Sequence, residues 1–188
     1  MAKAKYDRDD VINRSIELFW KNGYSGSSMK DVVKTTGLKP GSLYLSFGNK
    51  EAIYRESLQR YADNSIALIR DVLDNAESVG EGICQILKAK IEMTATEQYR
   101  SCFLVKTQHE LAFADSDLHD FAAAKLGEIE RLYCSYLEKE FSTELSRARA
   151  ASIMLHIFGL GVYGYQNRSP EKILRVFQVG LPWLPWAD

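Results

Sequence analysis

The sequence predicts an all-α protein, and three observations lead to that prediction. Apolar residues recur at helical spacing through almost every segment, as at Val11, Ile12, Ile16 and Phe19. Serine, asparagine and glycine residues stand where those helices would begin and end. No segment alternates apolar and polar residues in the way that a half-buried β-strand does.

We expect about nine helices, and the first four have the clearest boundaries. Ser28 and Asp31 have the spacing of a capping box, so a second helix should follow them and stop at Gly37. Proline suits the first turn of a helix, and asparagine is a common N-cap. The first helix is therefore expected to end at Asn22. The second should span Met29–Thr36, the third Pro40–Phe47, and the fourth should run from Lys50 to about Asn75.

Apolar spacing marks the remaining five helices, and the chain has no internal repeat or low-complexity tract. A break at Glu77–Gly82 precedes the fifth helix, and the apolar segment Cys102–Leu111 is the sixth. The seventh runs from Leu118 to Leu137 and the eighth from Ala148 to Tyr165. A capping start at Ser169-Pro170-Glu171 opens the ninth.

The composition excludes several classes of protein. No apolar run approaches the roughly 18 to 20 residues of a membrane span, and the lysine-containing start lacks the apolar stretch of a secretory signal. The three cysteines, Cys84, Cys102 and Cys134, are odd in number and far apart. They imply neither a disulfide framework nor a zinc site. We therefore expect a cytoplasmic protein without membrane contact, bound metal or cofactor.

The charge is unevenly distributed along the chain. Residues 1–60 carry 11 lysines and arginines against 7 aspartates and glutamates, whereas residues 61–188 carry 13 against 18. A basic N-terminal third on an acidic remainder indicates that the N-terminal part meets a polyanion.

Residues 29–48 have the length and the glycine turn of a helix-turn-helix, which presents its second helix to the DNA major groove. With Leu38, Leu43 and Phe47 facing inward, the outward residues of the third helix are small and polar. Serine and tyrosine hydroxyls can donate to phosphate oxygens, and lysine adds a positive charge. The alternative is a tight turn in a helical bundle, with polar residues that only face solvent.

The segment "LFWKNGYSGSSMKDVVKTTGLKPGSLYLSFGNKEAIY", residues 18–54, closely resembles the DNA-binding domain of the TetR/AcrR family of transcriptional regulators. The segment "CFLVKTQHEL" is similar to one found in a large subgroup of these regulators. Lys39-Pro40 departs from the pattern, because many relatives have a serine cap followed by lysine there. This departure weakens the N-cap of the third helix.

The resemblance implies a homodimeric repressor that a small-molecule inducer releases from a palindromic operator. It implies a DNA-binding domain over residues 1–50 and a ligand-binding and dimerisation domain over residues 51–188, with the eighth and ninth helices joining the subunits. The DNA contacts we predict are Ser28, Lys39, Pro40, Gly41, Ser42, Tyr44 and Lys50. The inducer is expected to be an apolar or aromatic molecule that releases DNA by favouring a different spacing of the two reading helices.

The ligand cavity is expected among the fourth to eighth helices. The predicted ligand-binding residues are Cys102, Phe103, Glu110, Phe113, Tyr133, His156 and Tyr163. Two of them have alternative interpretations. Cys102, in the first turn of a helix and near Arg100, has the setting of a sensor of oxidants or electrophiles, but a small buried hydrophobic residue is the commoner role. His156 is either a ligand contact or a hydrogen-bonded core histidine.

Other motifs lead to no function. The stretch "GLGVYG", residues 159–164, matches a dinucleotide fingerprint in letters but lies in a helical pattern with no preceding strand. In "DSDLHD", residues 115–120, the serine and aspartates suit a helix start better than a metal site. No nucleophile–histidine pair is evident, so we expect no enzyme. Two alternatives to a repressor remain: an all-α small-molecule-binding protein or enzyme without DNA binding, and a helical adaptor.

Overall fold

The computed structural model describes residues 6–96, 99–114, 116–166 and 169–186. Within these ranges the protein has nine α-helices, one short 3₁₀ helix and no β-strand. The helices are α1 (Arg8–Asn22), α2 (Met29–Thr36), α3 (Pro40–Phe47), α4 (Lys50–Asn75), α5 (Val79–Met93), α6 (Phe103–Leu111), α7 (Asp117–Leu137), α8 (Thr143–Tyr163) and α9 (Pro170–Gly180), and the 3₁₀ helix η1 is Gly164–Gln166. The predicted all-α class is confirmed.

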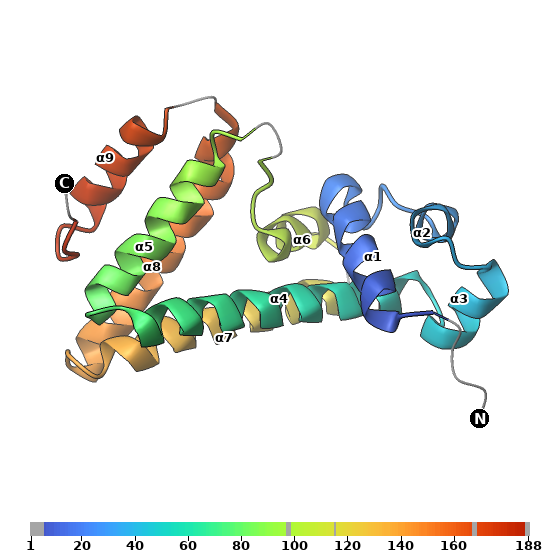
Figure 1. Ribbon diagram of the computed structural model, residues 1–188, viewed down its shortest axis with the longest axis horizontal. Helices are drawn as coiled ribbons and strands as arrows, with labels where there is room; N and C mark the ends of the chain where they lie inside the picture. The colour runs from blue at the N-terminus through green and yellow to red at the C-terminus, as the bar shows by residue number, and fades with distance from the viewer. Residues whose placement is uncertain (1–5, 97–98, 115, 167–168, 187–188) are drawn as a thin grey trace.

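The helices form two ends joined by a long pair (Figure 1). Helices α1, α2 and α3 gather at one end around the start of α4. Helix α4 runs with α7 to the other end, where α5 and α8 stand against them and α9 lies outermost. Helix α6 packs against α7 and α4, between the two ends. We call α1–α3 with the first turns of α4, residues 8–56, the head.

Local capping explains the boundaries of the head. The Ser28 hydroxyl accepts from the backbone N–H of Asp31, and the Asp31 carboxylate accepts from the backbone N–H of Ser28, so the predicted capping box is present. The side chain of Asn49 accepts from the backbone N–H of Ala52 at 2.8 Å, which starts α4 at the predicted residue. The predicted ranges of α2, α3 and α4 are confirmed.

Three predicted helix starts were wrong by a few residues, and serine caps explain two of them. Ser78 caps α5, so this helix begins inside the predicted break. Ser142 caps α8 and starts it at Thr143, five residues before the predicted Ala148. Cys102 is the N-cap of α6 and not part of its first turn, because its ψ of 127° is not helical. Apolar spacing alone misses a polar first turn.

One hydrophobic core runs through the whole fold. Where the head meets α6, six aromatic rings form a connected cluster, with centroids 4.8–5.8 Å apart between neighbours. We call it the aromatic cluster, and its members are Phe19, Trp20, Tyr24, Tyr54, Tyr61 and Phe103. The core is continuous across residue 50, because α4 contributes buried residues to both predicted domains. The boundary between the two domains stays a prediction. None of the helices in the described ranges is both long and apolar enough to cross a membrane.

Candidate nucleic-acid interface

Helices α2 and α3 are joined by a turn at Gly37, whose φ of 72° and ψ of 5° lie in the left-handed region. Glycine adopts this conformation without the steric cost that a Cβ brings. Val32 of α2 and Leu43 and Phe47 of α3 are buried against the head core. The turn and these three anchors fix the angle at which α3 presents its other face, as a helix-turn-helix requires.

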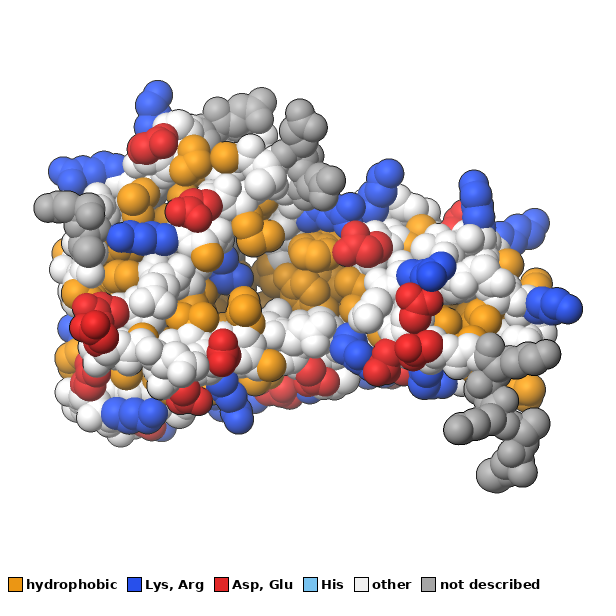
Figure 2. All heavy atoms as spheres, viewed as in Figure 1, with side chains coloured by type: hydrophobic (Ala, Val, Ile, Leu, Met, Phe, Trp, Pro, Cys, Tyr) orange, Lys and Arg blue, Asp and Glu red, His pale blue; other side chains and the backbone are white. Residues whose placement is uncertain are grey.

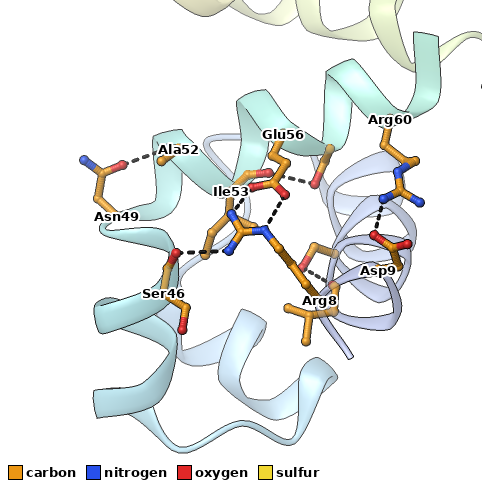
Figure 3. A network of polar contacts seen from close by, with 11 residues as sticks. Arg8, Asp9, Ser46, Asn49, Ala52, Ile53, Glu56 and Arg60 are labelled. Carbon is orange, nitrogen blue, oxygen red and sulfur yellow. Dashed lines mark hydrogen bonds and ion pairs between the residues drawn. The ribbon is translucent and has the colours of Figure 1, made fainter. Parts of the chain in front are cut away.

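A network around Arg8 holds α3 and α4 against the start of α1 (Figure 3). The Arg8 guanidinium donates to both carboxylate oxygens of Glu56, at 2.9 and 2.6 Å, and to the backbone carbonyl of Ser46 at 3.2 Å. One helical turn along α4, Arg60 pairs with Asp9. We call these five residues the Arg8 network. Because it reaches the last turn of α3, it sets the orientation of that helix relative to α1.

The outward face of α3 is small and mostly polar. Gly41, Ser42, Tyr44 and Leu45 are exposed, and a Cβ added at Gly41 would meet no atom within 4 Å. Lys39 occupies the N-cap without a side-chain hydrogen bond, as its sequence predicts, and Pro40 takes the first helical position. The structure therefore brings five of the seven predicted DNA contacts, Lys39 through Ser42 and Tyr44, to one exposed surface.

The other two predicted contacts, Ser28 and Lys50, have partners within the protein. The Ser28 hydroxyl donates to the Asp31 carboxylate at 2.6 Å as part of the capping box. The Lys50 ammonium donates to the backbone carbonyls of Tyr24 and Ser27, each at 3.0 Å, and lies 4.0 Å from the centre of the Tyr24 ring. An ammonium has three donors, so Lys50 fixes the loop between α1 and α2 and keeps one donor for another group.

The electrostatics of the head favour an anion. Each of the seven acids in residues 6–60 has a hydrogen bond or ion pair with a neighbouring residue: Asp7, Asp9, Asp10, Glu17, Asp31, Glu51 and Glu56. Within the described ranges, the exposed lysines Lys21, Lys30, Lys34 and Lys39 form no ion pair. Figure 2 shows Lys and Arg side chains projecting around the end that carries α2 and α3.

A second set of contacts joins the end of α1 to α6. The Glu110 carboxylate accepts from the backbone N–H groups of Tyr24 and Ser25, at 2.9 and 2.6 Å. Gly23, with a φ of 77°, permits this approach, because a Cβ there would lie 2.5 Å from a Glu110 oxygen. One turn earlier on α6, the Lys106 ammonium donates to the Trp20 carbonyl at 2.7 Å.

The segment before α6 adds two more contacts with α1. The indole N–H of Trp20 donates to the Ser101 carbonyl at 2.6 Å, and Arg100 forms an ion pair with Glu17 at 2.5 Å. We call the contacts that Arg100, Ser101, Lys106 and Glu110 make with α1 and its following loop the α6 linkage. Spacing within the sequence gave no signal for it, because the partners are more than 80 residues apart.

The same segment is also fixed to α8 and η1. The Tyr99 hydroxyl donates to the Leu160 carbonyl at 2.9 Å, and the backbone N–H of Ser101 donates to the Tyr165 hydroxyl at 3.0 Å. A Cβ at Gly164 would lie 2.5 Å from the Tyr99 ring. The last glycine of "GLGVYG" therefore makes room for Tyr99, and the segment 99–101 connects α8 directly to α1.

The seven predicted ligand-binding residues do not line one cavity. Cys102 borders a cavity of about 80 Å³ with Trp20, Tyr61 and Tyr99. Glu110 borders a cleft of about 490 Å³ between the end of α1, α6 and α8. His156 and Tyr163 border a groove of about 300 Å³ between α8 and α9. These three cavities are separate, so the shared ligand cavity stays a prediction. A helical pattern places a residue on a face without saying which helix covers it.

The other three predicted ligand residues lie elsewhere. Phe113 is fully exposed, so its side chain lines no cavity. Phe103 is buried at 1% exposure within the aromatic cluster. Tyr133 is buried in α7, its hydroxyl has no hydrogen-bond partner within the described ranges, and burial raises its pKa.

The remaining candidate groups have ordinary structural roles. His156 Nδ1 lies 2.8 Å from the Ser152 carbonyl, one helical turn away, so the ring is hydrogen-bonded as the alternative interpretation predicted. Burial raises the pKa of the Cys84 thiol to about 11, which makes it a poor nucleophile. Asp115, the first residue of "DSDLHD", lies outside the described ranges. The residues that are described contain no cluster of three metal-ligating side chains.

A cleft of about 720 Å³ with a largely apolar surface lies between α1 and α4. It shares Trp20 and Tyr61 with the small cavity beside Cys102. Figure 2 shows hydrophobic side chains gathered in this hollow. A ligand in the hollow would touch α1 directly.

The fold and this surface define a helix-turn-helix regulator: a small head with an exposed second helix, joined to a larger helical part that contains clefts. Residues 11–56 match the family described as bacterial regulatory proteins of the tetR family. Residues 11–56 therefore form a DNA-binding domain of the TetR family of transcriptional regulators, as the sequence indicated.

Relatives of known type cover nearly the whole chain. This chain is 29% identical to the HTH-type transcriptional repressor ComR of Escherichia coli, over 91% of this chain and 85% of ComR. It is 26% identical to a cysteine-substituted form of the TetR-family regulator CifR, solved with 26-base-pair operator DNA, over 99% of this chain and 100% of that one, with a TM-score of 0.80. A TetR-family regulator from Agrobacterium tumefaciens, at 15% identity and a TM-score of 0.80, shares the fold.

Proposed function

We propose that this protein is a sequence-specific DNA-binding transcriptional repressor that acts as a homodimer and leaves its operator when a small molecule binds. One observation carries the proposal: the exposed face of α3 combines Gly41 and Ser42 with Tyr44 and Leu45, and it stands beside lysines without ion pairs. That surface suits the floor of a major groove flanked by phosphates. The repressor ComR and the operator-bound CifR support the same function.

Within this proposal the DNA contacts have different tasks. Tyr44 and Lys39 bind phosphates from either side of the groove, while Ser42 and the Gly41 backbone lie on its floor. Lys50 acts mainly by holding the loop between α1 and α2, and its remaining donor adds one phosphate contact. Ser28 contributes through the start of α2, where a capped helix N-terminus favours a phosphate.

We propose that α8 and α9 join the two subunits. Their outward face carries large apolar side chains that are more than half exposed in the single chain, Leu155, Val162, Val176 and Val179. The groove beside His156 and Tyr163 lies on the same face. A second copy would bury this surface, and apolar burial is the main favourable contribution in such interfaces.

The effector is proposed to enter between α1, α4, α8 and the segment 99–102. The small cavity there is bordered by aromatic rings, and it adjoins the larger hollow between α1 and α4. An apolar or aromatic molecule that enlarged the cavity would move Ser101 away from Trp20. Because the α6 linkage holds the end of α1, that movement would reach the head and favour another spacing of the two α3 helices.

Selection from a pool of random DNA duplexes tests the function. We expect the protein to enrich a palindromic site and to bind it with two chains per duplex. Affinity should fall steeply as salt rises from about 50 to 200 mM, because phosphate contacts release counterions. Tyr44→Ala should weaken binding to all duplexes, whereas Ser42→Ala should change the preferred sequence. Enrichment of no sequence, or binding that does not respond to salt, would reject the proposed function.

A further inference from the structure

Helix α3 lacks the side chains that most often read bases through paired hydrogen bonds. From Pro40 to Phe47 it contains no arginine, lysine, asparagine, glutamine, aspartate, glutamate or histidine. Paired contacts to guanine, adenine or cytosine in the major groove use those side chains. Direct reading by α3 is therefore restricted to single hydroxyl contacts and to apolar contacts.

Leu45 occupies the centre of the outward face. Successive residues of an α-helix are about 100° apart, so Leu45 lies about 160° around the helix from each of the buried residues Leu43 and Phe47. Its side chain is 90% exposed. A leucine with this exposure gains nothing from the fold, and it stands where α3 would meet the floor of the groove.

Gly41 leaves space beside the Leu45 side chain. The two residues are four apart, so they lie on the same face in consecutive turns. Long helical side chains lean toward the N-terminus, which directs Leu45 over Gly41. No atom lies within 4 Å of the point where a Gly41 Cβ would stand. The outward face thus offers a leucine beside a notch about the size of a methyl group.

We propose that Leu45 makes the protein specific for thymine at one position of each half-site, by packing against the thymine C5 methyl group in the major groove. Thymine carries this methyl and cytosine carries hydrogen in its place. The neighbouring Ser42 hydroxyl can donate or accept, so it cannot make this distinction alone. The inference rests on the proposed DNA-binding function and names the base that α3 reads.

Replacement of thymine by deoxyuridine tests the inference, because it removes the methyl and leaves base pairing unchanged. The probes are duplexes enriched by the wild-type protein, with each thymine replaced in turn and binding followed by fluorescence anisotropy at fixed salt. We expect one replacement in each half-site to weaken binding about two- to fourfold, which is the effect of one buried methyl group. Restoring the methyl as 5-methylcytosine, compared with cytosine at the same position, should strengthen binding by a similar factor.

The variant Leu45→Ala should bind the thymine and deoxyuridine duplexes equally, while Ser42→Ala should keep the methyl preference even though it changes the preferred base at another position. Because Leu45 is exposed, its replacement should leave the melting temperature unchanged, which calorimetry checks. The inference is wrong if no deoxyuridine replacement weakens binding of the wild-type protein. It is also wrong if Leu45→Ala keeps the preference for the methyl group, because Leu45 would then not contact that methyl. Failure of the wild-type protein to enrich any duplex would count against the proposed function, so the two failures are distinguishable.

Discussion

The two ends of α1 are held in different ways. At its start, the Arg8 network joins α1 to α3 and α4 within the head. At its end, the α6 linkage joins α1 to a segment that is also fixed to α8. The first set of contacts orients the reading helix, and the second connects the head to the proposed dimer and effector regions. We propose that α1 keeps α3 oriented within the head and carries a change near α8 to the head.

The largest expected effect comes from breaking the aromatic cluster where the head meets α6. Phe103→Ala should destabilise the protein by about 3–5 kcal/mol, because it removes a buried ring that packs on Tyr54 and Tyr61. Urea unfolding measures this change. The matched control is Phe113→Ala, which removes a fully exposed ring and should change stability by less than about 0.5 kcal/mol. Equal effects of the two variants would refute the placement of Phe103.

A smaller effect is expected at the buried hydrogen bond between α4 and α6. Tyr54 and Thr107 are 2.8 Å apart, and the Thr107 hydroxyl already donates to the Phe103 carbonyl at 3.0 Å, so the Tyr54 hydroxyl is the donor. Tyr54→Phe removes that donor from a buried acceptor and should cost about 1–2 kcal/mol in urea unfolding. Thr107→Val, combined with Tyr54→Phe, should cost less than the sum of the two single variants.

The Arg8 network should matter more for DNA binding than for stability. Arg8→Ala removes a bidentate ion pair with Glu56 between partly exposed side chains, which contributes about 1 kcal/mol to stability. It also removes the hydrogen bond to the last turn of α3. We expect weaker binding to the enriched duplex with little change in the urea midpoint. Arg14→Ala is the control, because it removes the same charge from a pair that lies within α1. If both variants bind DNA equally well, the network does not orient α3.

The smallest effect concerns acid stability at the start of α2. Hydrogen bonds from the Ser28 side chain and backbone lower the pKa of Asp31. Its folded pKa therefore lies below the unfolded value of about 3.9, so the stabilisation is present above that value and is lost as pH falls through the folded pKa. Melting temperatures of Asp31→Asn should be lower than those of wild type near neutral pH and should converge with them as the pH falls through the folded pKa. A constant difference at all pH values would contradict this role.

The head could be predicted almost completely from the sequence, because its structure depends on local signals. The Ser28–Asp31 capping box, the Gly37 turn and the Asn49 cap act within four residues, and they fix α2, α3 and the start of α4. The exposure of Gly41, Ser42 and Tyr44 follows from the burial of Leu43 and Phe47 one helical face away.

The ligand residues could not be predicted in the same way, because their surroundings depend on contacts between distant segments. Phe103 and Phe113 were both expected to line the ligand cavity, yet one is buried and the other is exposed. Glu110 was expected to bind a ligand, and nothing in the sequence indicated that it accepts hydrogen bonds from residues 24 and 25. Only the packing of α6 against α1, α4 and α7 determines these outcomes.

The distance between the two heads of the dimer tests the central claim that the α6 linkage, and not the Arg8 network, controls their spacing. Spin labels on a cysteine at the exposed position Lys34, in a background with the three natural cysteines replaced by alanine, report that distance by pulsed electron spin resonance. We predict that Glu110→Ala broadens or shifts the distance distribution, whereas Arg8→Ala and the neighbouring control His109→Ala leave it unchanged. An unchanged distribution in Glu110→Ala, or an equal change in Arg8→Ala, would contradict the account.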